Sequence, residues 1–308
     1  MDKGGHADDN YDAIKRRVRV ADYLSVAQIY LKDNFALERP LTFSDVKPRL
    51  LGHFGTCHGI NVAYANLRLA DGFSMSDFVL GPGHGFPALN ANLWLDGKLA
   101  EVDERAMVDY DGLAHLCRDF SWPEGFPSHA SPMTPGVITE GGELGYALGA
   151  AYGLALGHPE KNVAVMIGDG ELETATALAS LNLVKLLTGP ENGKVWPILH
   201  LNGYKISAPT IYGRKSEHEL GEFFRGFGYT PVFIKDDEAE SFQAALLKAQ
   251  AVSHPFLILK SEKGAGSPKK HHEAHQVPLK NPKNDPKELR LLEKWLKSYR
   301  FKMEDLYD

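Results

Sequence analysis

The chain has 308 residues, of which 43% are hydrophobic, so it is long enough to bury a sizeable core. Charged residues make up 24% and the formal net charge is -6, which argues against a nucleic-acid partner. The first ten residues contain no apolar segment of a signal peptide, and no apolar run approaches the roughly 20 residues of a membrane helix. Cys57 and Cys117 are too few for a disulfide scaffold. We therefore expect a soluble, cytoplasmic protein with no membrane partner.

The first part of the chain shows little regular patterning. Residues 1–19 are predicted to be a flexible N-terminal segment. Residues 20–34 carry an apolar stripe at helical spacing, which predicts a helix. Residues 48–88 are rich in glycine and are predicted to be mostly loop. Histidines stand beside several of these glycines, and glycine lets the backbone approach a ligand closely, so this region is a candidate for chemistry.

From residue 141 onward the pattern becomes regular. Helices are expected over residues 142–156, 171–187, 217–225, 238–251 and 286–299. Short apolar strands are expected over residues 162–168, 196–201, 231–234 and 255–259. This alternation predicts a three-layer, doubly wound α/β fold, with a mostly parallel sheet and helices on both faces. We expect one domain over residues 20–285, followed by an amphipathic helix and tail over 286–308.

The segment Gly168-Asp169-Gly170-Glu171 stands where a buried strand is followed by a helix. In open α/β sheets, ligands bind beyond the carboxyl ends of the strands. Gly168 and Gly170 let main-chain amides approach an anion, and the start of a helix adds the positive end of its dipole. Asp169 supplies an oxygen ligand of the kind that Mg²⁺ prefers. The segment therefore predicts a site for a metal and a phosphate group.

A second oxygen donor is expected at the end of the next strand. Residues 200–204 offer the amide oxygen of Asn202 and a main-chain carbonyl near Tyr204. A Gly-Asp-Gly turn alone can be only a turn, because short glycine motifs are weak signals. Here the strand, helix, strand and Asn-Gly follow in the order that a metal site needs. We therefore predict Asp169, Asn202 and Tyr204 as the metal ligands.

From Gly168 to Asn202 the sequence resembles the thiamine-diphosphate motif, which begins Gly-Asp-Gly and ends in Asn, although the spacer is somewhat longer than usual. From about Asp22 onward the chain resembles the phosphoketolase family, which is related to the transketolases. The stretches that carry this resemblance are residues 51–56, 81–85, 120–123, 126–129, 140–146, 197–206, 274–279 and 291–299. The resemblance implies the thiamine-diphosphate-binding fold, with thiamine diphosphate and Mg²⁺ as cofactors.

The resemblance also implies that four histidines line the reaction cavity as catalytic residues. They are His53, His84, His129 and His275. Cleaving a ketose beside its carbonyl requires one hydroxyl to lose a proton, and the phosphoketolase reaction then eliminates another hydroxyl as water. Imidazoles titrate near neutral pH and can move protons in both directions. Any one of these histidines alone could be structural, but the glycines beside His53 and His84 favour access by a ligand.

Further cofactor contacts are implied in two other segments. The resemblance implies that Gly142, Glu143 and Leu144 lie near the cofactor rings. Lys263 stands in a Lys-Gly turn that is similar to one in the family, and is expected to neutralise the diphosphate; a solvated lysine is the alternative. Together with these four, the predicted cofactor-binding residues are Gly168, Gly170 and Glu171.

Two features complicate this interpretation. The family usually has other residues at four positions near its cavity, so the choice of substrate and the dehydration step are open; these positions are Phe54, Cys57, His58 and Thr139. A zinc site made by His271, His272 and His275 is a competing idea. It is disfavoured because two lysines adjoin it and no cysteine is near.

The resemblance implies a carbon–carbon lyase of the aldehyde-lyase class, which converts a ketose phosphate to an acyl phosphate and a shorter aldose phosphate. Such sites are shared with a second domain, which cradles the aminopyrimidine and supplies an activating glutamate. The chain ends at Asp308, about where the family's second domain follows. We therefore expect either a truncated chain or one subunit of a split enzyme, active with a separately encoded pyrimidine-domain subunit as an α₂β₂ hetero-oligomer.

Other functions remain open from the sequence. One is a transketolase-type or other acyl- or ketol-transfer subunit, and another is a non-catalytic regulatory subunit that retains the fold. A plain nucleotide-binding α/β protein is more remote, because the chain contains neither a Walker-type motif nor Gly-x-Gly-x-x-Gly.

Overall fold

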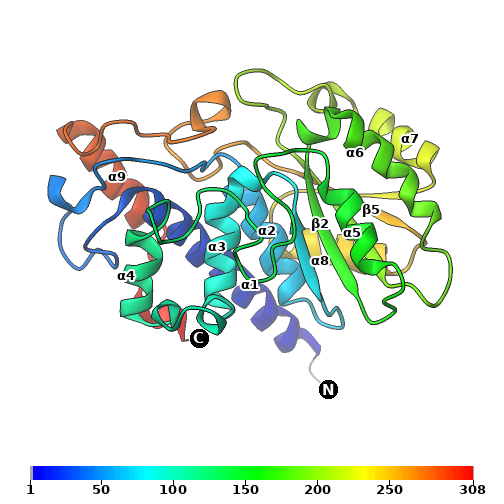
Figure 1. The fold of residues 1–308 in the computed structure, drawn as a ribbon, viewed down its shortest axis with the longest axis horizontal. Coiled ribbons are helices and arrows are strands. Elements are labelled where there is room, and N and C mark those ends of the chain that lie inside the picture. Colours follow the sequence, from blue (N-terminus) through cyan, green and yellow to red (C-terminus); the bar gives the residue numbers. More distant parts are fainter. Residues whose placement is uncertain (1–2, 308) are drawn as a thin grey trace.

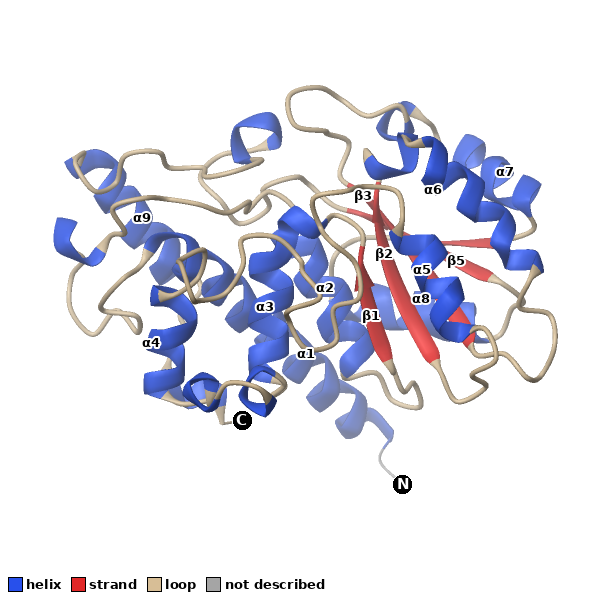
Figure 2. Cartoon of the chain, viewed as in Figure 1, coloured by secondary structure: helices blue, strands red, loops and turns tan. Residues whose placement is uncertain are grey.

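The computed structural model describes residues 3–307, with side chains from residue 9 onward. Its centre is a five-stranded sheet with helices around it (Figures 1 and 2). The strands are β1 Asp77–Leu80, β2 Asn162–Gly168, β3 Lys194–Leu201, β4 Thr230–Ile234 and β5 Pro255–Lys260. All neighbouring strands pair in parallel, in the order β1-β2-β3-β5-β4. Within the described residues, no helix is both long and apolar enough to span a membrane.

The sheet separates two hydrophobic cores, which is why the middle of each strand is mostly apolar. Successive side chains of a strand point to opposite faces. In β2, Val163, Val165 and Ile167 belong to one core, whereas Ala164 and Met166 belong to the other. The five central residues of the strand, 163–167, are therefore apolar for packing reasons, and the register is fixed from both sides.

Helices cover both faces and form the outer layers. On one face α5 (Ala147–Ala155) packs against β1, β2 and β3, and α7 (Glu217–Phe227) packs against β4. On the other face α8 (Ala239–Gln250) packs against β4 and β5. The chain runs from β1 to β3 in one direction and turns back from β4 to β5. Right-handed crossovers then place the connecting helices on opposite faces, which gives the predicted three-layer arrangement.

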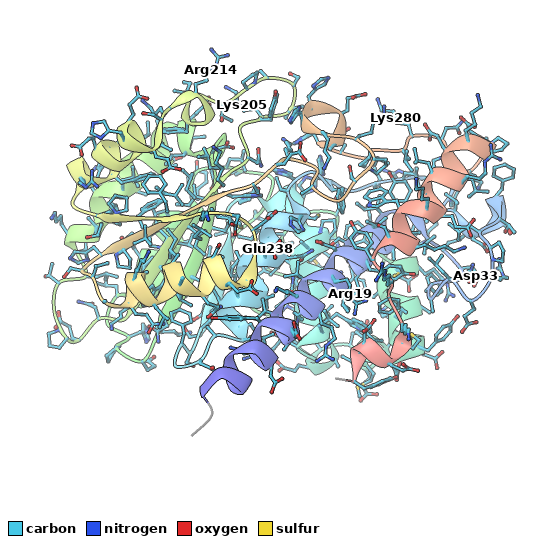
Figure 3. All side chains as sticks on the ribbon, turned by 180° about the vertical axis from the view of Figure 1, so that it is seen from behind. Arg19, Asp33, Lys205, Arg214, Glu238 and Lys280 are labelled. Atoms are coloured by element: carbon cyan, nitrogen blue, oxygen red, sulfur yellow. The ribbon has the colours of Figure 1, made fainter. Side chains whose placement is uncertain are left out.

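A helical group extends the second face. It consists of α1 (Lys3–Tyr30), α2 (Cys57–Arg68), α3 (Phe86–Leu95), α4 (Tyr110–Arg118) and α9 (Pro286–Ser298). α1 packs against α2, α3, α4, α8 and α9 and is the central helix of the group. From behind, α8 and α1 cross this face together, with Glu238 at the start of α8 (Figure 3). The segments directly before α2 and α3 adjoin this group, and they line part of the cavity described below.

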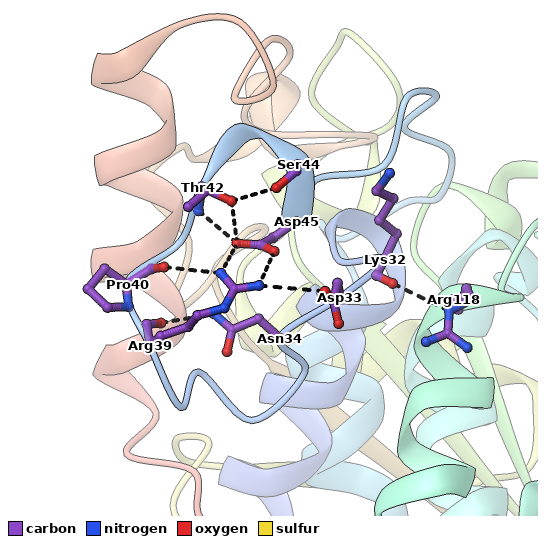
Figure 4. Close-up of polar contacts among 9 residues, drawn as sticks. All are labelled: Lys32, Asp33, Asn34, Arg39, Pro40, Thr42, Ser44, Asp45 and Arg118. Carbon is purple, nitrogen blue, oxygen red and sulfur yellow. Dashed lines mark hydrogen bonds and ion pairs between the residues drawn. The ribbon is translucent and has the colours of Figure 1, made fainter.

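The irregular segment between α1 and α2 is tightly held by one buried carboxylate (Figure 4). Asp45 is 1% exposed and accepts bonds of 2.7 Å from both Nη atoms of Arg39. Thr42 adds its amide and its hydroxyl to the same carboxylate, at 2.7 and 2.8 Å. The bonds from Arg39, followed by those from Thr42, lower the pKa of Asp45 to about 2 although burial opposes them. These bonds also cap a 3₁₀ turn, Phe43–Asp45, and hold the segment in place.

Two sequence predictions for the first part of the chain are wrong. Residues 1–19 were expected to be flexible, but the described part from Lys3 onward is helical; residues 1–2 lie outside the described chain. Ile14 is fully buried and Arg17 binds Asp96, so this end of α1 is held by packing and by ion pairs that no apolar stripe reveals. Residues 48–88 were expected to be mostly loop, but they contain α2 and β1.

The glycine-rich appearance of residues 48–88 has a packing explanation. Gly59 lies within α2, where a Cβ atom would be 2.1 Å from Nε2 of His200. The glycine therefore permits close helix–strand approach and does not mark a loop.

Two predicted helices are shorter than expected. The helix over 142–156 begins only at Ala147, because Gly145 adopts a φ of +101°, in the left-handed region. The helix over 171–187 is divided into a 3₁₀ turn Glu171–Glu173, α6 (Ala175–Ser180) and a 3₁₀ segment Leu181–Lys185. Thr174 is extended and its side chain caps the amide of Ala177, which starts a new helix within the predicted one.

Candidate active site

The predicted site residues come together in a cavity of about 300 Å³ at the carboxyl edge of the sheet. Four strands end there. β1 leads to Pro82 and His84, β2 to Asp169, β3 to Asn202, and β5 to Lys263. Parallel strands present their carboxyl ends on one edge, so residues far apart in sequence meet without any long excursion of the chain.

The floor of the cavity contains Asp169, which is almost fully buried. Its Oδ2 accepts bonds from the amide of Gly203 at 2.6 Å and from the hydroxyl of Thr210 at 2.9 Å. Its Oδ1 accepts the amide of Gly170 at 2.9 Å. A carboxylate has about four lone-pair positions, so these three bonds orient Asp169 and leave room for one further ligand. Burial raises the pKa of Asp169 to about 6, although the three bonds and Lys263 oppose it.

The other two predicted metal ligands lie beside Asp169. The Oδ1 atom of Asn202 accepts the amide of Tyr204 at 3.1 Å, which leaves it one acceptor position. The main-chain carbonyl of Tyr204 accepts a hydrogen bond from Nζ of Lys263 at 3.0 Å. The ring of Tyr204 stacks on His271, with ring centroids 4.4 Å apart. Carboxylate, amide and carbonyl oxygens are the donors that Mg²⁺ prefers, so this set fits a magnesium ion.

The four predicted histidines gather opposite this floor. His53 is central, with ring centroids 5.2 Å from His84, 5.1 Å from His129 and 5.1 Å from His275. His84 and His275 are also 5.1 Å apart. Three ring nitrogens, Nδ1 of His53, Nε2 of His84 and Nδ1 of His275, are buried and have no hydrogen-bond partner in the protein. Buried polar atoms normally have a hydrogen-bond partner, so these three nitrogens are available to bind a ligand.

The histidines are held in their neutral form. Burial, followed by neighbouring His129 and Lys263, lowers the pKa of His53 to about 4. Burial is also the largest cause for His275, whose pKa is lowered to about 3, and for His84, whose pKa falls well below its usual value. Burial lowers the pKa of His129 as well. At neutral pH each ring therefore has one nitrogen that donates and one that accepts.

Lys263 is a buried cation at the junction of the floor and the histidines. Its Nζ donates to the carbonyls of Tyr204 at 3.0 Å and Lys205 at 2.7 Å. Burial lowers the pKa of Lys263 to about 8, while Asp169 raises it. The alternative of a solvated lysine is thus wrong, because Lys263 is 2% exposed. A buried ammonium beside glycine amides suits an anionic ligand.

The remaining predicted cofactor residues divide into two groups. Gly142, Leu144, Gly168, Gly170 and Glu171 line the cavity. Glu143 does not line it and is exposed between two lining neighbours. The turn formed by residues 141–145 therefore presents Gly141, Gly142 and Leu144 to the cavity and leaves Glu143 outside it.

Sequence reasoning missed several residues of the cavity. Thr56 lies beside His53, and its buried hydroxyl has no hydrogen-bond partner in the protein. Thr210 orients Asp169 from 41 positions away in the sequence, and no spacing pattern predicts this contact. Lys205 and Ile206 line the mouth. Thr56 stands in a stretch that resembles the phosphoketolases, and this was the only signal that could have found it.

The four unusual positions do not line the cavity, although Phe54 and Cys57 directly adjoin the lining residues His53 and Thr56. Phe54 is fully buried against Trp295, with ring centroids 4.8 Å apart. Cys57 donates its thiol to the carbonyl of His53 at 3.2 Å, and Thr139 is half-buried in a loop. His58 points the other way, with Nδ1 2.7 Å from Asp22 and Nε2 3.1 Å from Asp237. Their effect on the reaction is therefore indirect at most.

The competing zinc site is not formed by the described residues. His275 lines the cavity, whereas His271 stacks on Tyr204. In the part of the chain that the structure describes, no group of three or more His, Cys, Asp or Glu side chains is placed to hold a metal ion. A magnesium site of the kind described above draws on amide and carbonyl oxygens and is not of that type.

Comparison with known proteins places the chain in a family. The family model described as the XFP N-terminal domain matches residues 6–308. The chain belongs to this family. It is 42% identical to a probable phosphoketolase of Bradyrhizobium diazoefficiens over 98% of its length, and 44% identical to one of Rhodopseudomonas palustris over 94%. The chain spans 41% of the length of each of these two relatives. The family resemblance expected from the sequence is thereby confirmed.

Solved structures support the fold independently. A transketolase mutant from Pichia stipitis has a TM-score of 0.67 at 19% identity, covering 96% of this chain and 41% of its own. A transketolase from Leishmania mexicana has a TM-score of 0.64 at 19% identity, covering 97% of this chain and 46% of its own. At this identity the likeness concerns the fold alone. Together with the parallel sheet, it confirms the predicted three-layer thiamine-diphosphate-binding fold.

Proposed function

We propose that this chain is the diphosphate- and metal-binding part of a thiamine-diphosphate enzyme of the phosphoketolase type. The proposal is carried by one observation: four neutral histidines with three unpaired nitrogens line the same cavity as Asp169 and Asn202. In this assignment Asp169, Asn202 and the carbonyl of Tyr204 hold Mg²⁺. The amides of Gly168 and Gly170 already donate to Glu171 and Asp169, so the diphosphate is bound by Lys263, whose Nζ keeps one donor position beyond its two carbonyl partners.

The reaction is a carbon–carbon lyase reaction of the aldehyde-lyase class. A ketose phosphate and inorganic phosphate give an acyl phosphate, a shorter aldose phosphate and water. Thiamine diphosphate, when bound, would supply an electron sink that stabilises the electron pair left on the substrate carbon when the carbon–carbon bond breaks. The protein's own contribution is to bind and orient the sugar and to move protons at its hydroxyl groups.

The histidines are suited to these proton transfers. His53, His84 and His275 are uncharged at neutral pH, so a ring nitrogen of each can accept a proton from a substrate hydroxyl. The ring centroids of these three histidines lie 5.1 to 5.2 Å apart, so one ring can act as a base while a neighbouring ring donates to the hydroxyl that leaves as water. Burial excludes water from the same space, which strengthens these interactions.

We further propose that a pyrimidine-binding subunit, encoded separately, covers the mouth of the cavity and completes an α₂β₂ assembly. The support is an exposed apolar rim: Leu144 and Ile206 both line the cavity and are 38% and 68% exposed. Clustered exposed apolar side chains around a functional cavity are typical of a protein–protein surface. Full activity of this chain purified alone from its native host would contradict the split arrangement.

The reaction is tested by trapping its product. The chain, copurified with its native partner, is incubated with phosphate and either xylulose 5-phosphate or fructose 6-phosphate, and acetyl phosphate is trapped as its hydroxamate. We expect sugar- and phosphate-dependent hydroxamate, reduced at least about 100-fold by His84→Asn. His158→Asn, at a half-exposed histidine outside the cavity, serves as the matched control and retains activity. No hydroxamate with either sugar would indicate a transketolase-type or other transfer instead.

A further inference from the structure

Glu171 occupies an unusual position in the floor of the cavity. It follows Asp169 by two residues, lines the cavity and is 3% exposed. Its Oε2 accepts the amide of Gly168 at 3.1 Å, and its Oε1 accepts the amide of Gly145 at 3.1 Å. Within the described residues, these two main-chain amides are its hydrogen-bond partners, and no cationic side chain pairs with it. The carboxylate therefore joins two separate segments of backbone.

A third segment, at Gly81, leaves space for the same carboxylate. At Gly81, directly after β1, a Cβ atom would lie 2.1 Å from Oε2 of Glu171. Any side chain at this position would displace the carboxylate. Glu171 is thus enclosed by the ends of β1 and β2 on one side and by the turn before α5 on the other.

The turn before α5 depends on the contact with Glu171. Gly145 has a φ of +101°, and a Cβ atom there would lie 2.3 Å from Oγ1 of Thr174. This end of the turn is fastened by the bond from the amide of Gly145 to Glu171. The other end is fastened by the amide of Gly141, which donates to the carbonyl of Ala130 at 2.7 Å. Between these two anchors, Gly142 and Leu144 face the cavity.

We infer that Glu171 is a positioning residue: its carboxylate fixes the 141–145 turn against the end of β2 and so sets the floor and one wall of the cavity. Each of its oxygens accepts a hydrogen bond from a main-chain amide, so the carboxylate acts on the two backbone segments that it joins. That this wall holds a cofactor rests on the proposed function, whereas the positioning itself does not.

The comparison of Glu171→Gln with Glu173→Gln tests this inference in the full chain. A glutamine at position 171 keeps the size of the side chain but has one acceptor oxygen, so its NH₂ group would face one of the two amides. Glu173 lies two residues further on and accepts Lys205 and the amide of Ile211, outside this contact. Both variants remove one carboxylate from the same 3₁₀ turn, so they are closely matched.

The readout is hydrogen–deuterium exchange of the peptide amides over residues 141–149 and at Gly168, measured without any ligand. We expect about tenfold faster exchange at Gly145 and Gly168 in Glu171→Gln, and native exchange there in Glu173→Gln. Equal exchange in the two variants would overturn the inference, whatever ligand the cavity binds. If Glu171→Gln does not fold, Glu171→Asp, which shortens the side chain but keeps the charge, is measured in the same way and should also exchange faster.

A second readout distinguishes positioning from direct contact. Thiamine diphosphate affinity is measured by calorimetry on the copurified complex. Weaker binding by Glu171→Gln together with faster exchange supports the positioning role. Weaker binding with unchanged exchange would overturn it in favour of direct contact. If the wild-type complex does not bind the cofactor at all, the proposed function fails while the exchange result still decides the role of Glu171.

Discussion

At the scale of single residues, His275 illustrates how burial prepares the cavity. It is 8% exposed, its Nδ1 has no hydrogen-bond partner in the protein, and burial lowers its pKa to about 3. An unfolded chain would have a histidine pKa near 6.5. Below that pH the unfolded state binds a proton that the folded state does not, so the charged form of His275 opposes folding.

The first prediction concerns the pH dependence of stability in His275→Asn. Because asparagine does not titrate, the variant lacks the destabilisation that protonation of His275 in the unfolded state causes at low pH. The free energy of unfolding of the wild type minus that of the variant should fall by about 1.4 kcal/mol for each pH unit below about 6. Urea unfolding at pH 7, 6 and 5 measures this difference. A difference that stays constant over the range would show that His275 is not held neutral by the fold.

Residue identity alone predicted part of the site. Asp169 and Asn202 were found because each follows an apolar strand, and parallel strands end at one edge. His129 and His275 have no such mark, and only the resemblance grouped them with His53. Thr210 was missed because its bond to Asp169 depends on how one loop folds back, which no local pattern encodes.

At the scale of elements, three segments cross at the base of the histidine cluster. The amide of Ala130 donates to the carbonyl of Gly83 at 2.9 Å, and the amide of Gly141 donates to the carbonyl of Ala130 at 2.7 Å. His84 directly follows Gly83, and His129 directly precedes Ala130. The crossing therefore sets the relative positions of the two histidines. Glycine is required here, because a Cβ atom on Gly141 would lie 2.7 Å from Cα of Gly83.

The second prediction follows from this crossing. Gly141→Ala should lower the free energy of unfolding by about 2 kcal/mol, because the added methyl group meets backbone that cannot move aside. Gly142→Ala is the matched control, since a Cβ atom there meets nothing within 4 Å. Urea unfolding of both variants measures the effect. Equal stability of the two variants would mean that the backbone at this crossing can move to accommodate the added methyl group.

The elements themselves were predicted unevenly, for physical reasons. The strand over 162–168 was predicted correctly because burial on both faces makes the central residues 163–167 of β2 apolar. The helix over 171–187 was overextended, because the cap at Thr174 depends on its extended backbone and not on composition. α2 was missed, since Gly59 is required by contact with His200, a residue 141 positions away.

At the scale of the whole molecule, the cavity mouth presents apolar side chains to solvent. The third prediction is that Ile206→Asp weakens association with the proposed partner subunit at least about tenfold, as expected for an apolar residue central to an interface. Ile206 is 68% exposed, so the change leaves the core intact. Leu247→Asp is the matched control, because Leu247 is 65% exposed on α8, away from the cavity. Analytical ultracentrifugation of the mixed subunits measures both, and equal weakening would contradict an interface at the mouth.

The central claim is that Asp169 and its neighbours hold a magnesium–diphosphate group. It is tested most directly by calorimetric titration of the copurified complex with thiamine diphosphate, with and without Mg²⁺, for the wild type and Asp169→Ala. We predict saturable binding that requires Mg²⁺ in the wild type, and an affinity at least about tenfold lower in Asp169→Ala. Binding of equal strength in the two proteins, or binding indifferent to Mg²⁺, would contradict the account.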